Sequence, residues 1–393
     1  MKNWKALGLV VLLATFTYTG CDKGQKAPQA PAAEDQGPAQ VTTGEEVEKA
    51  LVDGCEGSGD FLAPFNSGDF KTANGRASCA FNDSVKANPD KPDTKAALIA
   101  FLSRFALAFE SPEVEFLLLQ KVQANSLFGP SGNPSNLDPI MDGLTGNLDN
   151  WPMILHYLKK QMDAGRTPND VVGKVFEFID RNFGDWHVLA KAMSRDPGFL
   201  EVEISGAFVG KPSEVFKVNF SDASAADFYI TLGRAVSKVF SHYDMGVSSA
   251  ASLADVNALA ADLNADAKFL SLKADGNASE AGPYLDSLFT AMIQAAANFK
   301  VKPGIIVGSG DAYPKQLDDA LIASQLKESL KGRMVWMAAS DYSFAIDLKK
   351  MLADLPDAKT ISVPPVKVVG GNSIDFNEDF LKQFISGFSI LKE

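Results

Sequence analysis

Residues 167–205 read TPNDVVGKVFEFIDRNFGDWHVLAKAMSRDPGFLEVEIS, a helical pattern followed by a strand pattern. Thr167 is an N-cap candidate, and Pro168 would occupy the first helical position. One apolar helical face follows, formed by Val171, Val175, Ile179 and Phe183. Gly184 ends this predicted helix, and a shorter one follows, capped by Asp185 and carrying Trp186, Leu189 and Met193. Asp196, Pro197 and Gly198 should end the shorter helix.

The hydrophobic period changes at Leu200, where apolar and polar residues begin to alternate as in a half-buried strand. The alternation returns at Phe216, Val218 and Phe220, and turn residues lie between the two runs at 210–213. This pattern predicts a β-hairpin over residues 200–220. The change of period also marks the best candidate for a domain boundary.

Helical periodicity dominates the rest of the chain after Thr94. Helices are predicted from Thr94, Ser111, Trp151 and Phe228, from Ser252 and Gly282, and around the apolar sets Leu317 to Leu330, Phe344 to Leu355 and Phe376 to Phe388. Short apolar pieces at 304–307, 334–337 and 361–369 are candidate strands that could join the hairpin in a small sheet. The predicted fold is therefore mainly α (α+β), a multi-helical body of antiparallel helices with a minor β-hairpin.

The N-terminus has the three parts of a secretory signal: Lys2 and Lys5, an apolar run from Leu7 to Phe16, and Gly20 before Cys21. The run is too short to span a bilayer. This end resembles the lipobox of bacterial lipoproteins, although Tyr18 stands where that class usually has leucine. The resemblance implies that Cys21 becomes the first mature residue and carries lipid such as palmitate. A secretory signal with an unmodified cysteine is the alternative.

The resemblance implies a chain anchored to a membrane of the bacterial cell envelope, facing the periplasm or the exterior. Residues 1–20 would be the signal peptide and residues 21–44 the lipidated cysteine and a disordered tether rich in Ala, Pro and Gln. Two helical domains would follow, residues 45–199 and residues 200–393 with the hairpin.

The formal charge of −12 argues against nucleic acid as a partner, because nucleic-acid binding relies on Lys and Arg to neutralise phosphates. If Cys21 is lipidated, Cys55 and Cys79 remain as a pair, which in an oxidising compartment predicts a structural disulfide. Both lie in Gly-, Asn- and Ser-rich sequence without a strong helical pattern. A redox pair would more typically show Cys-x-x-Cys spacing, and no histidine lies near them to complete a zinc site.

Other motifs favour structural interpretations. Gly308 to Asp311 is a Gly-rich turn without a dinucleotide fingerprint or Walker lysine. The Asp/Asn alternations at 262–266 and 375–379 lack the glycine and glutamate of an EF-hand. His156, His187 and His242 each lie on or beside an apolar helical face, and a catalytic group including them would have to assemble from distant residues. We therefore assign no catalytic, cofactor-binding or metal residue and predict no cofactor.

The sequence favours a non-catalytic envelope protein that binds a protein partner. One alternative is a lipoprotein that binds a small molecule or lipid in a cleft between the helical halves. Another is an envelope hydrolase without a recognisable motif.

Overall fold

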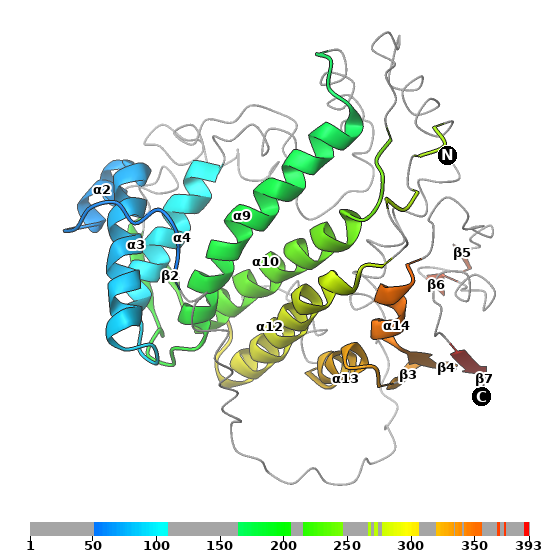
Figure 1. Ribbon diagram of the computed structural model, residues 1–393. Coiled ribbons are helices and arrows are strands. Elements are labelled where there is room, and N and C mark those ends of the chain that lie inside the picture. The colour runs from blue at the N-terminus through cyan, green and yellow to red at the C-terminus, as the bar shows by residue number, and fades with distance from the viewer. Residues whose placement is uncertain are drawn as a thin grey trace.

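The computed structural model describes residues 51–108, 164–205, 215–246, 266–268, 271–273, 277–305, 320–333, 335–339 and 342–355, and strand residues 368–369, 373–374 and 389–392. Within these residues the fold is mainly α with small antiparallel sheets, as predicted (Figure 1). Among the same residues, no helix combines the length and the apolar character needed to cross a bilayer.

Three helices form the N-terminal part: α2 (Leu62–Ser67), α3 (Phe70–Ala87) and α4 (Thr94–Ala108). Asp69 caps α3 by accepting a hydrogen bond from the backbone N–H of Thr72. Asp93 accepts one from Ala96 at the start of α4, the helix predicted from Thr94. α3 and α4 pack against each other, and α4 also packs against α9 (Pro168–Ser194).

α9 is one continuous helix, so the predicted break at Gly184 is wrong. Its start is as predicted: Thr167 and Asp170 form a capping box, and Pro168 occupies the first turn. A glycine inside a helix costs about 1 kcal/mol relative to alanine. Burial of a large apolar side chain such as Trp186 or Met193 contributes roughly 1.5–3 kcal/mol, so packing outweighs the local preference.

The predicted hairpin is present. β1 (Val202–Ser205) pairs antiparallel with β2 (Val215–Val218), with Val202 opposite Val218 and Ile204 opposite Phe216. α10 (Phe220–Phe240) follows. It starts eight residues before the predicted Phe228 and includes Phe220, predicted to belong to the strand, because Asn219 and Asp222 form a capping box directly after β2. It packs along α9 on one side and along α12 (Gly282–Val301) on the other, so the three helices lie side by side (Figure 1).

The C-terminal part contains η4 (Ser279–Ala281), α13 (Ala320–Leu330), α14 (Leu348–Ala353), β3 (Val335–Ala339), β4 (Tyr342–Ile346) and β7 (Ser389–Lys392). The strands pair in the order β3–β4–β7. Phe344, predicted to be helical, lies in β4, and the helix begins only after the cap residue Asp347. Backbone pairing on both sides of β4 outweighs the helical spacing of its apolar residues.

The predicted strand at 334–337 corresponds to β3, but it pairs with β4 and not with the hairpin. At the end of the predicted piece 361–369, β5 (Val368–Val369) pairs with β6 (Ser373–Ile374). Local alternation predicts a strand but not its partner, because the partner is chosen by contacts distant in sequence.

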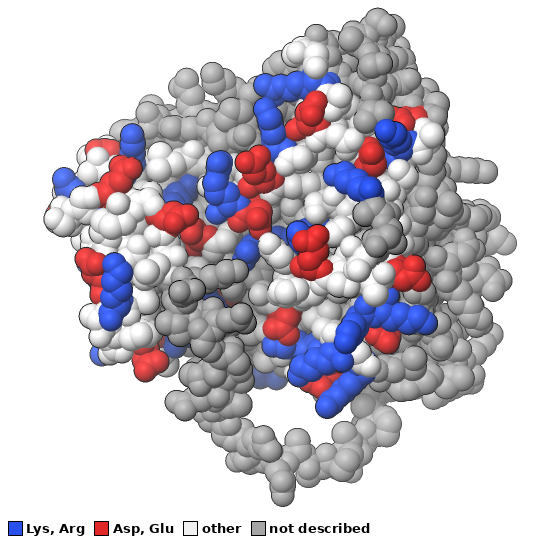
Figure 2. Space-filling view, viewed as in Figure 1, with Lys and Arg blue, Asp and Glu red and all other residues white. Residues whose placement is uncertain are grey.

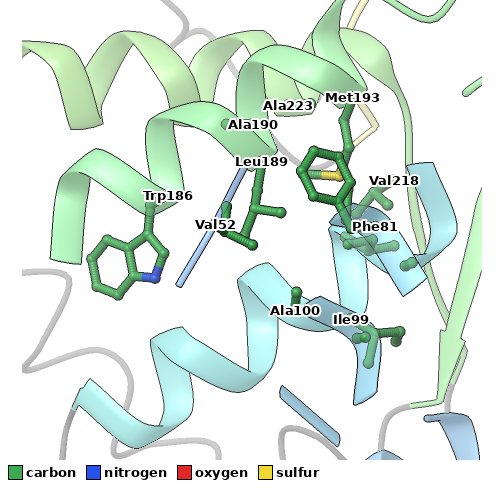
Figure 3. Packing of buried hydrophobic residues seen from close by; sticks show 14 of the residues in the cluster. Val52, Phe81, Ile99, Ala100, Trp186, Leu189, Ala190, Met193, Val218 and Ala223 are labelled. Carbon is green, nitrogen blue, oxygen red and sulfur yellow. The ribbon is translucent and has the colours of Figure 1, made fainter. Parts of the chain in front are cut away.

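The main hydrophobic cluster lies between α3, α4, α9 and the hairpin (Figure 3). Trp186 stands among Phe183, Phe105 and Phe101, with ring centroids 4.9, 5.8 and 6.2 Å away. The cluster includes Phe199 and residues of the hairpin and of α10. The candidate boundary between residues 199 and 200 therefore lies inside one packed region. A second cluster joins α10, α12 and α13.

Several predictions lie outside the described residues. These are the signal peptide, Cys21 and the tether; the helices from Ser111, Trp151 and Ser252 and around Phe376 to Phe388; His156; the turn at 308–311; and the alternation at 375–379.

Candidate functional site

The two cysteines outside the leader form a disulfide, as predicted: Cys55 and Cys79 are joined by an S–S bond of 2.00 Å, with Cα atoms 4.6 Å apart. Cys55 is exposed and lies in an irregular segment, whereas Cys79 is buried in α3. The expectation that both cysteines lie in irregular sequence is thus wrong for Cys79. The small residues beside Cys79, Ala77 and Ser78, are buried in α3 together with larger side chains such as Phe81.

Residues 52–60, which we call the strap, run along α3 in the opposite direction. At one end, Asn82 exchanges two hydrogen bonds with the backbone of Val52, at 2.9 and 2.8 Å. Further along, the backbone N–H of Glu56 donates to the carbonyl of Gly75 at 3.2 Å. Arg76 Nη1 donates to the carbonyl of Asp60 at 2.9 Å. The disulfide lies between these contacts, so the strap is fixed to α3 along its length.

Two residues outside the strap make this close approach possible. Gly75 leaves room for the strap, because a Cβ there would lie 2.8 Å from the carbonyl oxygen of Glu56. Arg104 of α4 donates to the carbonyl of Asp53 in the strap and to Ser78 of α3, and it pairs with Asp185 of α9. One guanidinium therefore joins the strap to three helices. Burial raises the pKa of the Asp185 carboxyl above its usual value although Arg104 opposes this.

The strap also contributes to the hydrophobic core. Val52 is only 4% exposed and belongs to the main cluster, and Figure 3 shows it beside Leu189 of α9. Its neighbour Leu51, where the described chain begins, is 39% exposed. Val52 is thus the first buried residue of the described chain.

The two described histidines both contact carboxylates of neighbouring helices. His187 Nδ1 of α9 lies 2.5 Å from Asp227 Oδ1 of α10, and both side chains are largely buried. His242, at the end of α10, lies 3.7 Å from Glu280. A carboxylate can orient an imidazole for proton transfer. Within the described residues, however, the hydrogen bonds of His187 include no serine or cysteine that would complete a nucleophilic triad.

A charge cluster joins α9, α10 and α12, formed by Asp180, Arg234, Lys238, His242, Glu280 and Tyr284. Lys238 pairs with Glu280 at 2.8 Å, and Tyr284 donates to Asp180 at 3.1 Å. The Arg234 guanidinium lies 5.1 Å from the centre of the Tyr284 ring, within cation–π range. Arg234 and Lys238 are four residues apart in α10, and His242 follows four residues later, just beyond the end of the helix.

The ionisable groups of this cluster respond to burial and to one another. The hydrogen bond from Lys238 lowers the pKa of the Glu280 carboxyl, and the same bond raises the pKa of Lys238. Burial lowers the pKa of His242, against the attraction of Glu280. Burial also raises the pKa of Tyr284. These pairings connect η4 and the start of α12 to half-buried side chains of α10.

A shallow depression of about 350 Å³ lies between the start of α12, the end of α13 and α14. Its surface includes Pro283, Leu330 and Leu352, with Asp286, Lys331 and Lys349 among the charged residues around it. Figure 2 shows Lys and Arg side chains gathered at the lower right, where α13 and α14 lie in Figure 1, with acidic side chains among them. Lys331 is paired with Glu328.

In the part of the chain that the structure describes, no group of three or more His, Cys, Asp or Glu side chains is placed to hold a metal ion.

Sequence reasoning missed the partners of these groups. The contacts of Asp227, Glu280 and Arg104 described above join residues 26 to 81 positions apart, from Arg104 with Ser78 (26) to Arg104 with Asp185 (81). The four-residue spacing on α10 was the one local signal that could have indicated the charge cluster.

No protein-family model, no curated protein and no solved structure matches this chain.

Proposed function

We propose that this chain is an exported lipoprotein, anchored to a membrane of the bacterial cell envelope through lipid on Cys21. The observation that carries the proposal is the pairing of the cysteines. Of the three in the sequence, Cys55 and Cys79 are bonded to each other, which leaves Cys21 directly after the apolar leader. Disulfides persist in extracytoplasmic compartments and are rare in the cytosol. The bond and the leader therefore support the same destination.

The lipid would supply a lasting attachment. Each buried CH₂ group contributes about 0.8 kcal/mol, and one acyl chain alone binds only marginally. Bacterial lipoproteins, which the N-terminus resembles, carry several chains. The body would face the periplasm or the exterior.

We further propose that the helical body binds a protein partner and does not catalyse a reaction. The described histidines are part of the packing between elements, since His187 contacts Asp227 of α10 and His242 contacts Glu280 of η4. The acidic charge of the chain favours solubility and disfavours nucleic acid as the partner.

Metabolic labelling with an alkyne analogue of palmitate tests the anchor. The wild-type protein should be labelled and recovered with membranes, and Cys21→Ser should lose the label. The matched control, Cys55→Ser with Cys79→Ser, retains Cys21 and should keep it. Unprocessed wild-type protein in the cytosol with all thiols reduced would contradict the proposal.

Affinity capture from detergent-solubilised, cross-linked membranes tests the binding role. We expect one protein at near-stoichiometric amount, and its recovery should survive His187→Gln, because that substitution alters a contact between helices and not the surface. Repeated recovery of no stoichiometric protein would exclude the role.

The depression beside α13 favours a second candidate function, binding of a small amphiphilic anion. Leu330 and Leu352 would contact an apolar chain, and Lys349 would lie near its acidic group. Native mass spectrometry with added lauric acid should show a complex that Lys349→Glu weakens about tenfold, which corresponds to roughly 1.4 kcal/mol. Lys174→Glu, on an exposed part of α9, is the control. Equal binding by both variants would dismiss this site.

A further inference from the structure

We propose that the strap is a mechanical clamp, which transfers a pull on the lipid anchor directly into the middle of α3. The inference rests on the proposed anchor at Cys21, because only an anchored chain is pulled at this end. It goes beyond that function by assigning the disulfide a role under load, in addition to its effect on folding equilibrium.

The first step concerns where the load meets the body. Any pull on Cys21 reaches the described chain at Leu51 and then at Val52, the first residue with a buried side chain. Val52 is held there by its two hydrogen bonds with Asn82. Arg104, which bonds the next carbonyl, holds the strap to α4. These contacts are non-covalent, so sustained tension can break them one after another.

The second step concerns what stops this process. Three residues after Val52, the chain is joined covalently to α3 through Cys55 and Cys79. With the bond intact, tension passes from Cys55 into Cys79 and does not pass through the residues between them. α2 and the first half of α3, up to Cys79, belong to that loop and carry no load.

The third step concerns the direction of the strap. Because it runs antiparallel to α3, a pull without the disulfide would peel residues 52–60 from the helix and would then unwind α2 and α3 from their N-terminal ends. The contacts that remain are the burial of Val52 and the hydrogen bonds at Asn82, Gly75 and Arg76, which lie one after another along the strap and would break in sequence and not together. The disulfide replaces this peeling by a pull on the centre of a packed helix.

The consequence is a fixed limit on extension. The cysteines are 24 positions apart, and an extended chain spans 3.3–3.6 Å per residue. The disulfide therefore prevents about 80 Å of chain from being stretched out under load. A lipoprotein whose tether lengthened by that amount under load would lose its spacing from the membrane. The clamp keeps the spacing constant.

Single-molecule force measurements on the full mature chain, expressed without leader and lipid, test the clamp. Cys21 is the free thiol in both the oxidised wild type and the Cys55→Ser, Cys79→Ser double variant, so one handle attaches there and the other at the C-terminus. In the double variant, we expect the first rupture at no more than half the force of the first rupture in the wild type. This event should release the strap, α2 and α3, and its length should exceed that of the first wild-type event by about 80 Å.

Asn298→Ala is the control for general destabilisation, because it removes a buried contact far from the strap while keeping the disulfide. It should leave the length of the first event unchanged. An equal first-rupture force in the wild type and the double variant, or a first event in the double variant that does not include residues 52–87, would overturn the clamp. If the wild-type protein is not labelled by the palmitate analogue in cells but the two force curves differ as expected, the anchor is refuted and the clamp is not.

Discussion

Gly75 shows how a single residue decides whether the strap can lie against α3. It is buried inside α3, where alanine would ordinarily be the better helix former by roughly 0.5–1 kcal/mol. Its Cβ position lies 2.8 Å from the Glu56 carbonyl oxygen, closer than real Cβ contacts. The lower helix propensity of Gly75 is thus offset by the close contact between the strap and α3 that this glycine allows.

Gly75→Ala should therefore destabilise the protein by about 1–3 kcal/mol, the usual cost of overpacking. Gly173→Ala is the matched control, because it is also inside a helix, is exposed and has nothing within 4 Å of the added Cβ. The control should stabilise by roughly 0.5–1 kcal/mol. Urea unfolding measures both. Equal effects of the same sign would mean that the strap does not depend on contact with Gly75.

His242 shows how burial makes one residue sensitive to pH. Its pKa in the folded protein lies below the ordinary 6.5 because burial disfavours the charged ring, and Lys238 and Lys273 oppose charging as well. Glu280 favours the charged form but does not reverse the shift. The unfolded chain consequently binds a proton at His242 more readily than the folded protein does.

By linkage, His242 should make the protein less stable as pH falls through 6.5 and down to its lowered folded pKa, and should contribute nothing further above 6.5. The free energy of unfolding of the wild type should therefore fall more between pH 7.5 and 5 than that of His242→Gln. Urea titrations at several pH values give the difference, in which the titration of all other groups largely cancels. Parallel curves would show that burial of His242 has no such effect.

At the scale of elements, buried polar side chains set how the helices pack. Asn298 of α12 donates to the carbonyl of Ser194, at the end of α9, at 2.8 Å and to the hydroxyl of Ser224 in α10 at 2.5 Å. It thereby satisfies a carbonyl that the end of α9 would otherwise leave without a helical partner. The side-chain amide of Asn298 thus joins α9, α10 and α12.

Asn298→Ala should cost about 1–3 kcal/mol, because it leaves a buried carbonyl and hydroxyl without this donor. Asn66→Ala, in the exposed part of α2, should change stability by less than about 0.5 kcal/mol. Thermal unfolding followed by circular dichroism compares them. A neutral Asn298→Ala would mean that water or another donor replaces the amide.

At the scale of the whole molecule, α9 and α10 share one core across the candidate boundary at residues 199 and 200. Phe199, Ile204 and Val218 belong to the same cluster as Leu189 and its neighbours in α9. A piece of chain ending at 199 would leave the α9 side of this core facing water. The region around the hairpin is thus part of the packing between the helices.

The predicted first domain, residues 45–199, should therefore unfold without a cooperative thermal transition when expressed alone. When residues 45–199 are refolded together with residues 200–393, the mixture should show a cooperative thermal transition. Circular dichroism melting curves of each piece and of the mixture provide the measurement. A cooperative transition of the isolated piece, at the temperature of the full chain, would establish residues 45–199 as an independent domain.

The sequence by itself determined the helical class, the hairpin and the starts of α4, α9 and α12, because caps such as Thr167 and Pro168 and the period of apolar residues act within a few positions. It also indicated the disulfide by counting cysteines. Only the tertiary structure decided that α9 continues through Gly184, that Phe344 lies in a strand, that Cys79 is helical and that the strap lies along α3. These features depend on contacts between residues distant in the chain, whose burial contributes more free energy than the local preference that each one overrides.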